Sequence, residues 1–231
     1  MPRDWNIPKC LSTRKAEEQN EVFVMRVLDM FSAKGNATKA FKDRGHNVTT
    51  IDNNPKFKPD ICQDIMGLTS KTLRTKFSQF NFIWASPPCD KFSMMSVGRW
   101  WSPIKKETRE AIRLVLHTLD LIEELEPEYW ILENPMGMLR RVIGNPNYHI
   151  TQCQYGRKHM KPTDLWGKLP ESWIPKRCKN RMSCHIPAPR GSRTGIQGKL
   201  SKEDRSKIPY GLSLSICEAI EKATKQELCL K

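Results

Sequence analysis

The stretch F-N-F-I-W-A-S-P-P-C-D-K-F-S, residues 80–93, decides how the rest of the chain is interpreted. Its first six residues are mostly large and apolar, which predicts a short buried strand. Pro87 and Pro88 end that strand, because proline has no backbone donor for a sheet. Cys89 follows, so a thiol is held on a stiff turn past a strand end, where open α/β sheets bind ligands. Cys89 is therefore either a small buried apolar residue or a nucleophile.

The composition of the chain narrows the classes of protein to which it can belong. Its 231 residues are enough for one substantial core, or for one core with a small appended lobe. A hydrophobic content of 38% with 28% charged residues is typical of a globular domain in water. The sequence has no apolar run long enough for a membrane span and no apolar signal region at its start. We therefore expect no membrane and no secretion.

The charge balance indicates the kind of partner that the chain binds, and the cysteines indicate the redox compartment in which it works. Lys and Arg number 39 against 25 Asp and Glu, a net charge of +14. Such a charge favours a polyanionic partner, most often nucleic acid, over a merely basic surface. The eight cysteines lack the dense pattern of a disulfide scaffold. They predict free thiols in a reducing interior.

A βαβ unit of about 30 residues is predicted near the start of the chain. The β-rich run 22–31 leads through the small residues Ser32–Asn36 into a helix that ends near Gly45, and the strand 48–51 ends at Asp52. A small-residue turn lets a ligand approach the backbone, and an acid after the next strand can accept ribose hydroxyls. The alternative is an ordinary strand-to-helix turn.

Two more acidic residues fall at predicted strand ends. Asp64 lies where a third strand should end, either to contact an adenine amino group or as a solvated turn residue. After the clearest helix, 107–126, the strand 129–132 is expected to end at Glu133. Burying a Glu there is costly, which favours a functional carboxylate over a structural one. Further helices are predicted at 71–77, 136–143 and 208–225, and a further strand at 148–154.

The chain divides by composition into four parts. We expect an arm over 1–21, a catalytic core over 22–154, a small irregular basic lobe over 155–207, and a helix within 208–231 that packs back on the core. The loop 90–106 is either a mobile lid over the site or a packed loop that its tryptophans anchor.

The strand-end acids and thiol occur in an order that resembles the DNA cytosine carbon-5 methyltransferases. The similar motifs are D-M-F-S-A-K-G-N (29–36), S-P-P-C (86–89), E-N-P (133–135), Q-C-Q (152–154) and I-P-Y-G-L-S-L-S-I (208–216). No single motif is specific, but Pro-Cys and Glu-Asn at this spacing after a βαβ unit are. The resemblance covers most of the chain and suggests a compact member of phage or bacterial type.

The resemblance implies a fold and a reaction. The fold would be α/β and Rossmann-like, of the kind that uses S-adenosylmethionine, with a small irregular recognition lobe. The reaction would move a methyl group to carbon 5 of a flipped-out cytosine in DNA. Cys89 would attack carbon 6, and Glu133 would contact the ring nitrogen. Asn134 would brace the Pro-Cys turn, which Pro88 would shape.

The resemblance also assigns binding residues. Cofactor contacts are expected from Asp29, Phe31, Ser32, Gly35, Asn36, Asp52, Asp64, Ile65 and Pro87. DNA contacts are expected from Ser93, Arg99, Gln154, Arg157, Arg190 and Arg193.

Three departures from the family pattern stand out. Ala33 and Asn36 stand where glycines are common. Gln154 and Gly156 replace two arginines, which leaves Arg157 or Lys158 to take over one role and the contact to the cytosine carbonyl unassigned. Ser206-Lys207 replace the usual Gly-Asn before the last motif.

A cysteine cluster lies in the predicted lobe. Cys178, Cys184 and His185 form a C-x5-C-H pattern that, with Cys153 or another His, could bind zinc. The spacing is not that of a standard finger, so a zinc site is the less favoured alternative.

Two other functions fit the same residues. One is the same chemistry on transfer RNA, and the other is a non-catalytic nucleic-acid-binding relative, for which the missing arginines argue. We expect a cytoplasmic monomer in a bacterial or phage-infected cell. The target site, and a role in restriction, self-protection or regulation, do not follow from the residues.

Overall fold

The computed structural model describes residues 23–94, 97–179, 182–188 and 200–229, so the predicted arm and the basic run that holds Arg190 and Arg193 lie outside it. Over these ranges the chain forms a sheet of order β3-β2-β1-β4-β5-β7-β6. None of the helices in the described ranges has the length and apolarity that a membrane crossing needs.

The first five strands are parallel, and the last two are antiparallel to their neighbours. The strands are β1 (Arg26–Met30), β2 (Asn47–Asp52), β3 (Ile61–Cys62), β4 (Phe82–Ala85), β5 (Tyr129–Pro135), β6 (Tyr148–Thr151) and β7 (Pro162–Lys168).

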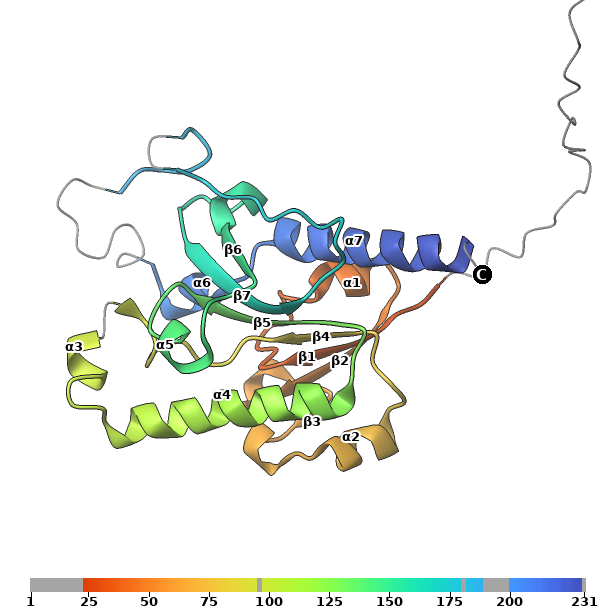
Figure 1. Cartoon of the computed structure of the whole chain (residues 1–231), viewed down its shortest axis with the longest axis horizontal. Helices are drawn as coiled ribbons and strands as arrows, with labels where there is room; N and C mark the ends of the chain where they lie inside the picture. The colour runs from red at the N-terminus through yellow and green to blue at the C-terminus, as the bar shows by residue number, and fades with distance from the viewer. Residues whose placement is uncertain (1–22, 95–96, 180–181, 189–199, 230–231) are drawn as a thin grey trace, which may run out of the picture.

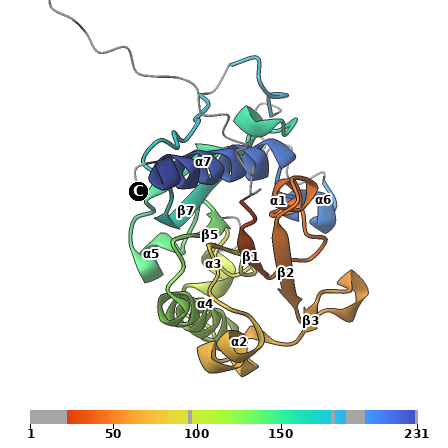
Figure 2. The same ribbon diagram turned by 90° about the vertical axis from the view of Figure 1, so that its right-hand side faces the viewer.

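Helices cover both faces of the sheet (Figures 1 and 2). One face carries α1 (Lys39–Asp43) and α7 (Tyr210–Cys229), and the other carries α2 (Ser70–Lys76) and α4 (Lys106–Leu125). The short elements are α3 (Val97–Trp100), α5 (Arg140–Ile143), α6 (Lys202–Ser206) and the 3-10 turns η1 (Pro55–Phe57), η2 (Ile65–Gly67) and η4 (Gln152–Tyr155). The three layers form the expected Rossmann-like α/β fold.

Strand β4 shows why the sheet needs both helical layers. Phe82 and Trp84 point into the cluster under α1 and α7, while Ile83 and Ala85 point into the cluster under α4. All four side chains are fully buried. A strand that is apolar on both sides is typical of a central parallel strand.

Strand β5 is longer than the predicted 129–132. It continues through Glu133 to Pro135 because β7 pairs antiparallel beside it, with Glu133 opposite Leu165 and Pro135 opposite Thr163. The missing donor of Pro135 is tolerated at the last residue of the strand. Glu133 therefore lies inside a strand and does not follow it.

The sheet also extends past the core boundary that we placed at residue 154. Strand β7 lies within the sheet, between β5 and β6, although the sequence assigned its residues to the lobe. The strand predicted at 148–154 ends at Thr151 and turns into η4. Both differences arise because residues 148–168 form an antiparallel pair, which the sequence pattern did not show.

The described part of the loop 90–106 is packed. The indole nitrogen of Trp101 donates to the carbonyl of Lys91 at 2.6 Å, and the Trp101 ring lies 6.3 Å from that of Phe92. The ammonium of Lys91 sits 3.6 Å from the centre of the Trp100 ring. These contacts favour the packed loop over the lid.

Helix α7 closes the fold on the α1 side of the sheet. Leu212, Ile216 and Ile220 are fully buried beneath it. Its start requires a glycine, because a Cβ on Gly211 would lie 2.7 Å from the carbonyl oxygen of Tyr155. This close approach fixes α7 against η4.

Candidate functional site

The site is built at the edge of the sheet where the parallel strands end. Strands β1, β2, β4 and β5 run in one direction, so their carboxyl ends lie side by side. Met30 is paired with Ala85, and Ala85 with Leu132. The residues that follow these three positions therefore meet at one edge, as expected for an open α/β sheet.

Cys89 sits on a tight turn that rests against the chain after β5. The amides of Phe92 and Ser93 donate to the carbonyl of Cys89 at 3.1 and 3.0 Å. The carbonyl of Phe92 in turn accepts from the amide of Met138 at 2.8 Å. A Cβ on Gly137 would lie 2.2 Å from the oxygen of Phe92, so the contact requires glycine there. Sequence reasoning missed Gly137, although it lies only two residues after the E-N-P motif.

Asn134 fastens the Pro-Pro turn to β5. Its side-chain nitrogen donates to the carbonyl of Pro87 at 3.0 Å, and the residue is buried. This is the bracing contact that the resemblance implies. Pro88 lies between the two fixed points and is exposed.

The carboxyl of Glu133 is buried at the end of a hydrogen-bonded chain. The indole nitrogen of Trp84 donates to the hydroxyl oxygen of Ser86 at 2.8 Å, and that hydroxyl is hydrogen-bonded to Glu133. Glu133 is 5% exposed, and its Oε1 has no partner among the described residues. Burial raises the pKa of Glu133, against the opposing effects of Lys161 and Ser86. The carboxyl therefore keeps its proton to higher pH than an ordinary Glu.

The thiol of Cys89 is placed within electrostatic reach of Glu133. Burial is the main cause that raises the pKa of Cys89, and the charges of Glu133 and Asp90 raise it further. Lys161 acts in the opposite direction and lowers this pKa. The resting thiol is therefore protonated, and the cation beside it is what favours the thiolate.

Two cations from the chain after η4 face this pair. Lys161 donates to the carbonyl of Arg205 at 2.9 Å, and its charge acts on both Cys89 and Glu133. Burial lowers the pKa of Lys161. Arg157 donates to Gln152 Oε1 at 3.1 Å and acts on Glu133.

Arg157 was among the DNA contacts predicted from the sequence, whereas no pattern in the sequence pointed to Lys161. The position of Lys161 depends on the antiparallel pairing of β7 with β5, which begins at Thr163, two residues later. A β-hairpin pattern before residue 162 would have been the signal.

The turn after β1 has an unusual backbone. Phe31, Ala33 and Gly35 have φ of 63°, 46° and 68°, in the left-handed region that favours glycine. Ala33 therefore takes a glycine-like conformation at a position where the family commonly has glycine. Asn36 follows as a half-buried residue.

Polar atoms in this turn are buried without partners. Asp29 is fully buried and accepts from the hydroxyl of Thr38 at 2.7 Å, while its Oδ1 has no partner in the described chain. The same holds for the buried hydroxyl of Ser32. Burial raises the pKa of Asp29 to about 7, and the charge of Asp52 adds to this. Unpaired buried polar atoms are costly, so these two indicate where a ligand group fits.

Asp52 and Asp64, the two other acids expected to contact the cofactor, differ in the backbone amides that they bind. Asp52 accepts from the amides of Ala33 and Asn54, each at 2.9 Å, so it ties the turn after β1 to the end of β2. Asp64 is exposed and caps η2 by accepting from the amide of Met66 at 2.9 Å, while Ile65 is buried in the core.

A family model described as "C-5 cytosine-specific DNA methylase" matches residues 25–152, which contain every strand end of this site. The chain belongs to this family. It is 31% identical to the "Probable DNA (cytosine-5)-methyltransferase" of Frog virus 3 (isolate Goorha) over 173 residues, which cover 69% of this chain and 78% of the viral protein.

Two solved structures are also similar to this methylase. The Entamoeba histolytica methyltransferase EhMeth has 14% identity and a TM-score of 0.45, and the match covers 71% of this chain and 58% of that one. A mutant of Spodoptera frugiperda DNMT2 has 16% identity and a TM-score of 0.44, with 68% and 56% covered. The methylase thus spans less than two thirds of the length of either.

Those of the expected DNA contacts that fall within the described residues do not form one cluster. Ser93 lies on the Cys89 turn, and Arg99 is exposed on α3, 5.2 Å from the ring of Trp100. Gln154 donates to the sulfur of Cys184 at 3.1 Å and so faces the cysteine cluster.

Proposed function

We propose that this methylase transfers a methyl group from S-adenosylmethionine to carbon 5 of cytosine in DNA, through a covalent bond between Cys89 and the base. The observation that carries the proposal is the buried carboxyl of Glu133. One of its oxygens has no hydrogen-bond partner in the described part of the chain, its pKa is raised by burial, and Cys89 lies within reach of its charge. A protonated carboxyl there suits the ring nitrogen of a pyrimidine.

The residues support a two-stage reaction. The thiol of Cys89 first loses its proton to water, and the thiolate sulfur then bonds to carbon 6. The electron pair of the carbon 5–carbon 6 double bond shifts to the carbon 4–carbon 5 bond, and the pair of the carbon 4–nitrogen double bond moves to the ring nitrogen, which Glu133 protonates. Carbon 5 can then accept a methyl group. A base next removes the carbon 5 proton, the double bond re-forms, the sulfur leaves as thiolate, and the ring nitrogen returns its proton to Glu133.

The turn after β1 fits the methyl donor. S-adenosylmethionine, when bound, supplies an electrophilic methyl group on a sulfonium sulfur. The unpartnered atoms of Asp29 and Ser32 offer hydrogen bonds to a polar ligand at this turn. Asp52 is half-buried beside them, with both oxygens already holding the backbone and lone pairs left for a ribose.

Lys161 takes the place of the missing arginines. A cation that lowers the pKa of Cys89 favours the attacking thiolate, and it also stabilises negative charge that develops on the cytosine carbonyl. Arg157 supports this role from its place beside Glu133, while its other bonds run to the carbonyls of Asp204 and Lys207 at 2.8 Å each.

DNA is the proposed substrate because of charge and family. The net charge of +14 suits a polyanion. A cytosine inside a duplex cannot reach a thiol at a strand end, so the base must leave the stack.

The test compares substrates and one matched pair of variants. The full chain is assayed for transfer of tritiated methyl groups to duplex DNA and to transfer RNA, alone and as Cys89→Ser and Cys62→Ser. We expect transfer to DNA, lost by about three orders of magnitude or more in Cys89→Ser. Cys62 is an exposed thiol on β3, so Cys62→Ser should keep the activity.

A second readout tests the covalent step. Duplex DNA with 5-fluorocytosine blocks loss of the group at carbon 5, so the wild-type chain should stay bound to it in denaturing gels. If only transfer RNA is methylated and duplex DNA is not, the proposed substrate is wrong and RNA takes its place. If the folded protein transfers methyl groups to neither substrate, the remaining interpretation is a non-catalytic nucleic-acid-binding member of the family.

A further inference from the structure

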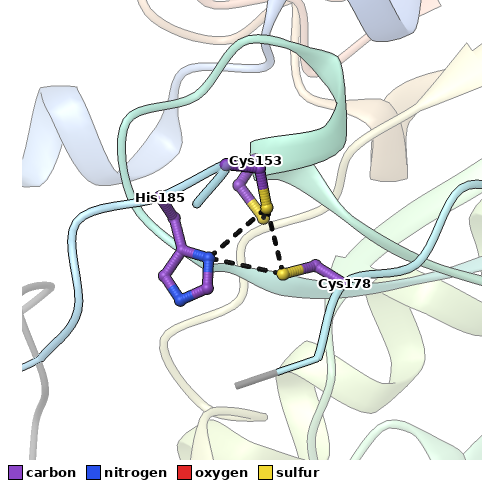
Figure 3. A group of neighbouring side chains, drawn as sticks. Cys153, Cys178 and His185 are labelled. Carbon is purple, nitrogen blue, oxygen red and sulfur yellow. Dashed lines mark hydrogen bonds between the residues drawn. The ribbon is translucent and has the colours of Figure 1, made fainter. Parts of the chain in front are cut away.

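Four side chains that the proposed reaction does not use converge beside η4. Cys153 comes from η4 itself, and Cys178 and His185 come from the chain after β7 (Figure 3). Cys184, from the same stretch after β7, completes the group. Their ligand atoms, three sulfurs and one ring nitrogen, all lie within 4.8 Å of one another. The sequence pattern predicted the last three as a group and left the fourth member open.

The distances within the group do not describe disulfides. The sulfurs of Cys178 and Cys184 are 3.2 Å apart, and those of Cys184 and Cys153 are 3.8 Å apart. A disulfide bond is about 2.0 Å long. All three cysteines are free.

The distances do match a tetrahedral zinc ion. Bonds of about 2.3 Å to sulfur and about 2.0 Å to nitrogen place sulfurs about 3.8 Å apart, and sulfur and nitrogen about 3.5 Å apart. The Nδ1 of His185 lies 3.3 Å from the sulfur of Cys178 and 3.5 Å from that of Cys184. The group needs only a small expansion to surround an ion.

The chain around the group has little regular structure and little apolar burial of its own. Residues 169–188, as far as they are described, contain no helix or strand. Within the described part of 174–188, only Cys178 is buried. A segment with so little apolar burial is of the kind that a structural metal folds.

The surroundings suit thiolate ligands. The amide of Gln154 donates to the sulfur of Cys184 at 3.1 Å, a second-layer contact that orients a ligand. Zinc with three thiolates and a neutral imidazole carries a net charge of −1. The exposed cations Arg177 and Lys179, next to Cys178, offset that charge.

We propose that Cys153, Cys178, Cys184 and His185 hold a structural zinc ion with four protein ligands. Three soft sulfurs and one imidazole in a tetrahedral arrangement select zinc over harder cations. Binding releases the three thiol protons. With all four positions filled by protein, the ion keeps no open position for catalysis.

The site has a consequence for the cations of the reaction centre. Cys153 is flanked by Gln152, whose side chain accepts from Arg157 at 3.1 Å. The amide of Ile186, one residue after His185, donates to the carbonyl of Lys158 at 2.9 Å. The ion would therefore fix both ends of the segment that presents Arg157.

Another cluster of metal-ligand type serves as an internal comparison. His46, Cys217 and Glu221 also lie close together. The ring nitrogens of His46 are already engaged with the amide of Met25 and with Glu221, and Glu221 is paired with Arg44. This second group is an ion-pair cluster and carries no metal in the proposal.

The experiment measures metal in the full chain, purified under reducing conditions with zinc in the medium. Elemental analysis should give about one zinc per chain. Cys178→Ser and Cys184→Ser should lower this at least about tenfold, whereas Cys62→Ser and Cys217→Ser should keep it. The two control variants change thiols outside the group.

A cobalt form keeps the proposal testable if the ligand variants fail to fold. Wild-type chain reconstituted with Co²⁺ should show visible bands of a tetrahedral ion and sulfur-to-metal charge transfer in the near ultraviolet. Removal of zinc by a chelator should speed amide exchange at 151–157 and 176–186, and leave β1 and β4 unchanged.

Three results would overturn the proposal. These are a folded chain that stays free of metal after incubation with zinc, a Cys178–Cys184 disulfide in the protein as isolated, and equal zinc loss from the Cys62 control. Each is independent of methyl transfer, so the zinc site and the proposed function fail separately.

Discussion

The parallel and antiparallel halves of the sheet share the apolar core, but only the antiparallel half adds an ion pair to a buried carboxylate among the described residues. In the parallel half, β4 buries four apolar side chains completely. In the antiparallel half, β7 buries the charged Asp164, which accepts from Arg140 and pairs with His149, each at 2.6 Å. Apolar burial tolerates small shifts, whereas paired charges hold only in one geometry. The parallel half thus gives the site its frame, and the antiparallel half gives it its cations.

The largest effect on stability should come from truncating a core side chain of the parallel half. Trp84 is fully buried and belongs to the cluster under α1 and α7. We expect Trp84→Ala to lower the free energy of unfolding by about 3–5 kcal/mol, measured by urea denaturation. Leu116→Ala, at a position on α4 that is 43% exposed, should change it by less than about 0.5 kcal/mol. Equal losses in both variants would contradict the importance of this core.

A smaller effect should come from Asp29, a carboxyl group that is fully buried in the parallel half. The pKa of Asp29 is about 7 when folded and about 4 when unfolded, so the folded state binds more protons between these values. Stability from this group is therefore full at low pH and is lost as pH rises toward 7. The loss should be about 3 kcal/mol between about pH 4 and pH 6.5.

Asp29→Asn should remove that loss and leave the remaining pH dependence in place. The measurement is urea denaturation of both proteins across this range. Curves that stay parallel from pH 4 to pH 6.5 would show that Asp29 has an ordinary pKa.

The smallest effect should come from the cation that the antiparallel half supplies. Lys161 lowers the pKa values of both Cys89 and Glu133. In Lys161→Met both values rise, so both limbs of the pH profile of methyl transfer should move to higher pH. At neutral pH the rate should fall about 100-fold, because less thiolate forms and a stabilising charge is gone.

Two further variants make the Lys161 comparison specific. Lys161→Arg should recover most of the rate, since it restores the charge. Lys168→Met, at the exposed far end of β7, should leave the pH profile unchanged. A change in KM without a shift in either limb would show that Lys161 acts only in binding.

The same division explains what could be predicted from the sequence. Phe82–Ala85 is an apolar run and 48–51 is a β-branched run, and each ends in turn residues. Their strand ends, and with them Cys89, could therefore be placed. Glu133 could be placed at the right edge, although within a strand. Lys161 and Gly137 could not, because their positions depend on pairing between distant segments. Cys153 could not be assigned to the cysteine group for the same reason, because it reaches the other three ligands only through the tertiary fold.

The position of α7 in the chain has a consequence for synthesis. The ribosome makes every strand before it makes this helix, yet Leu212, Ile216 and Ile220 belong to the same cluster as Phe82 and Trp84. Until α7 leaves the ribosome, the apolar side chains on one face of the sheet lack part of their cover and are exposed to water. Nascent chains halted before Tyr210 should therefore bind chaperones or aggregate.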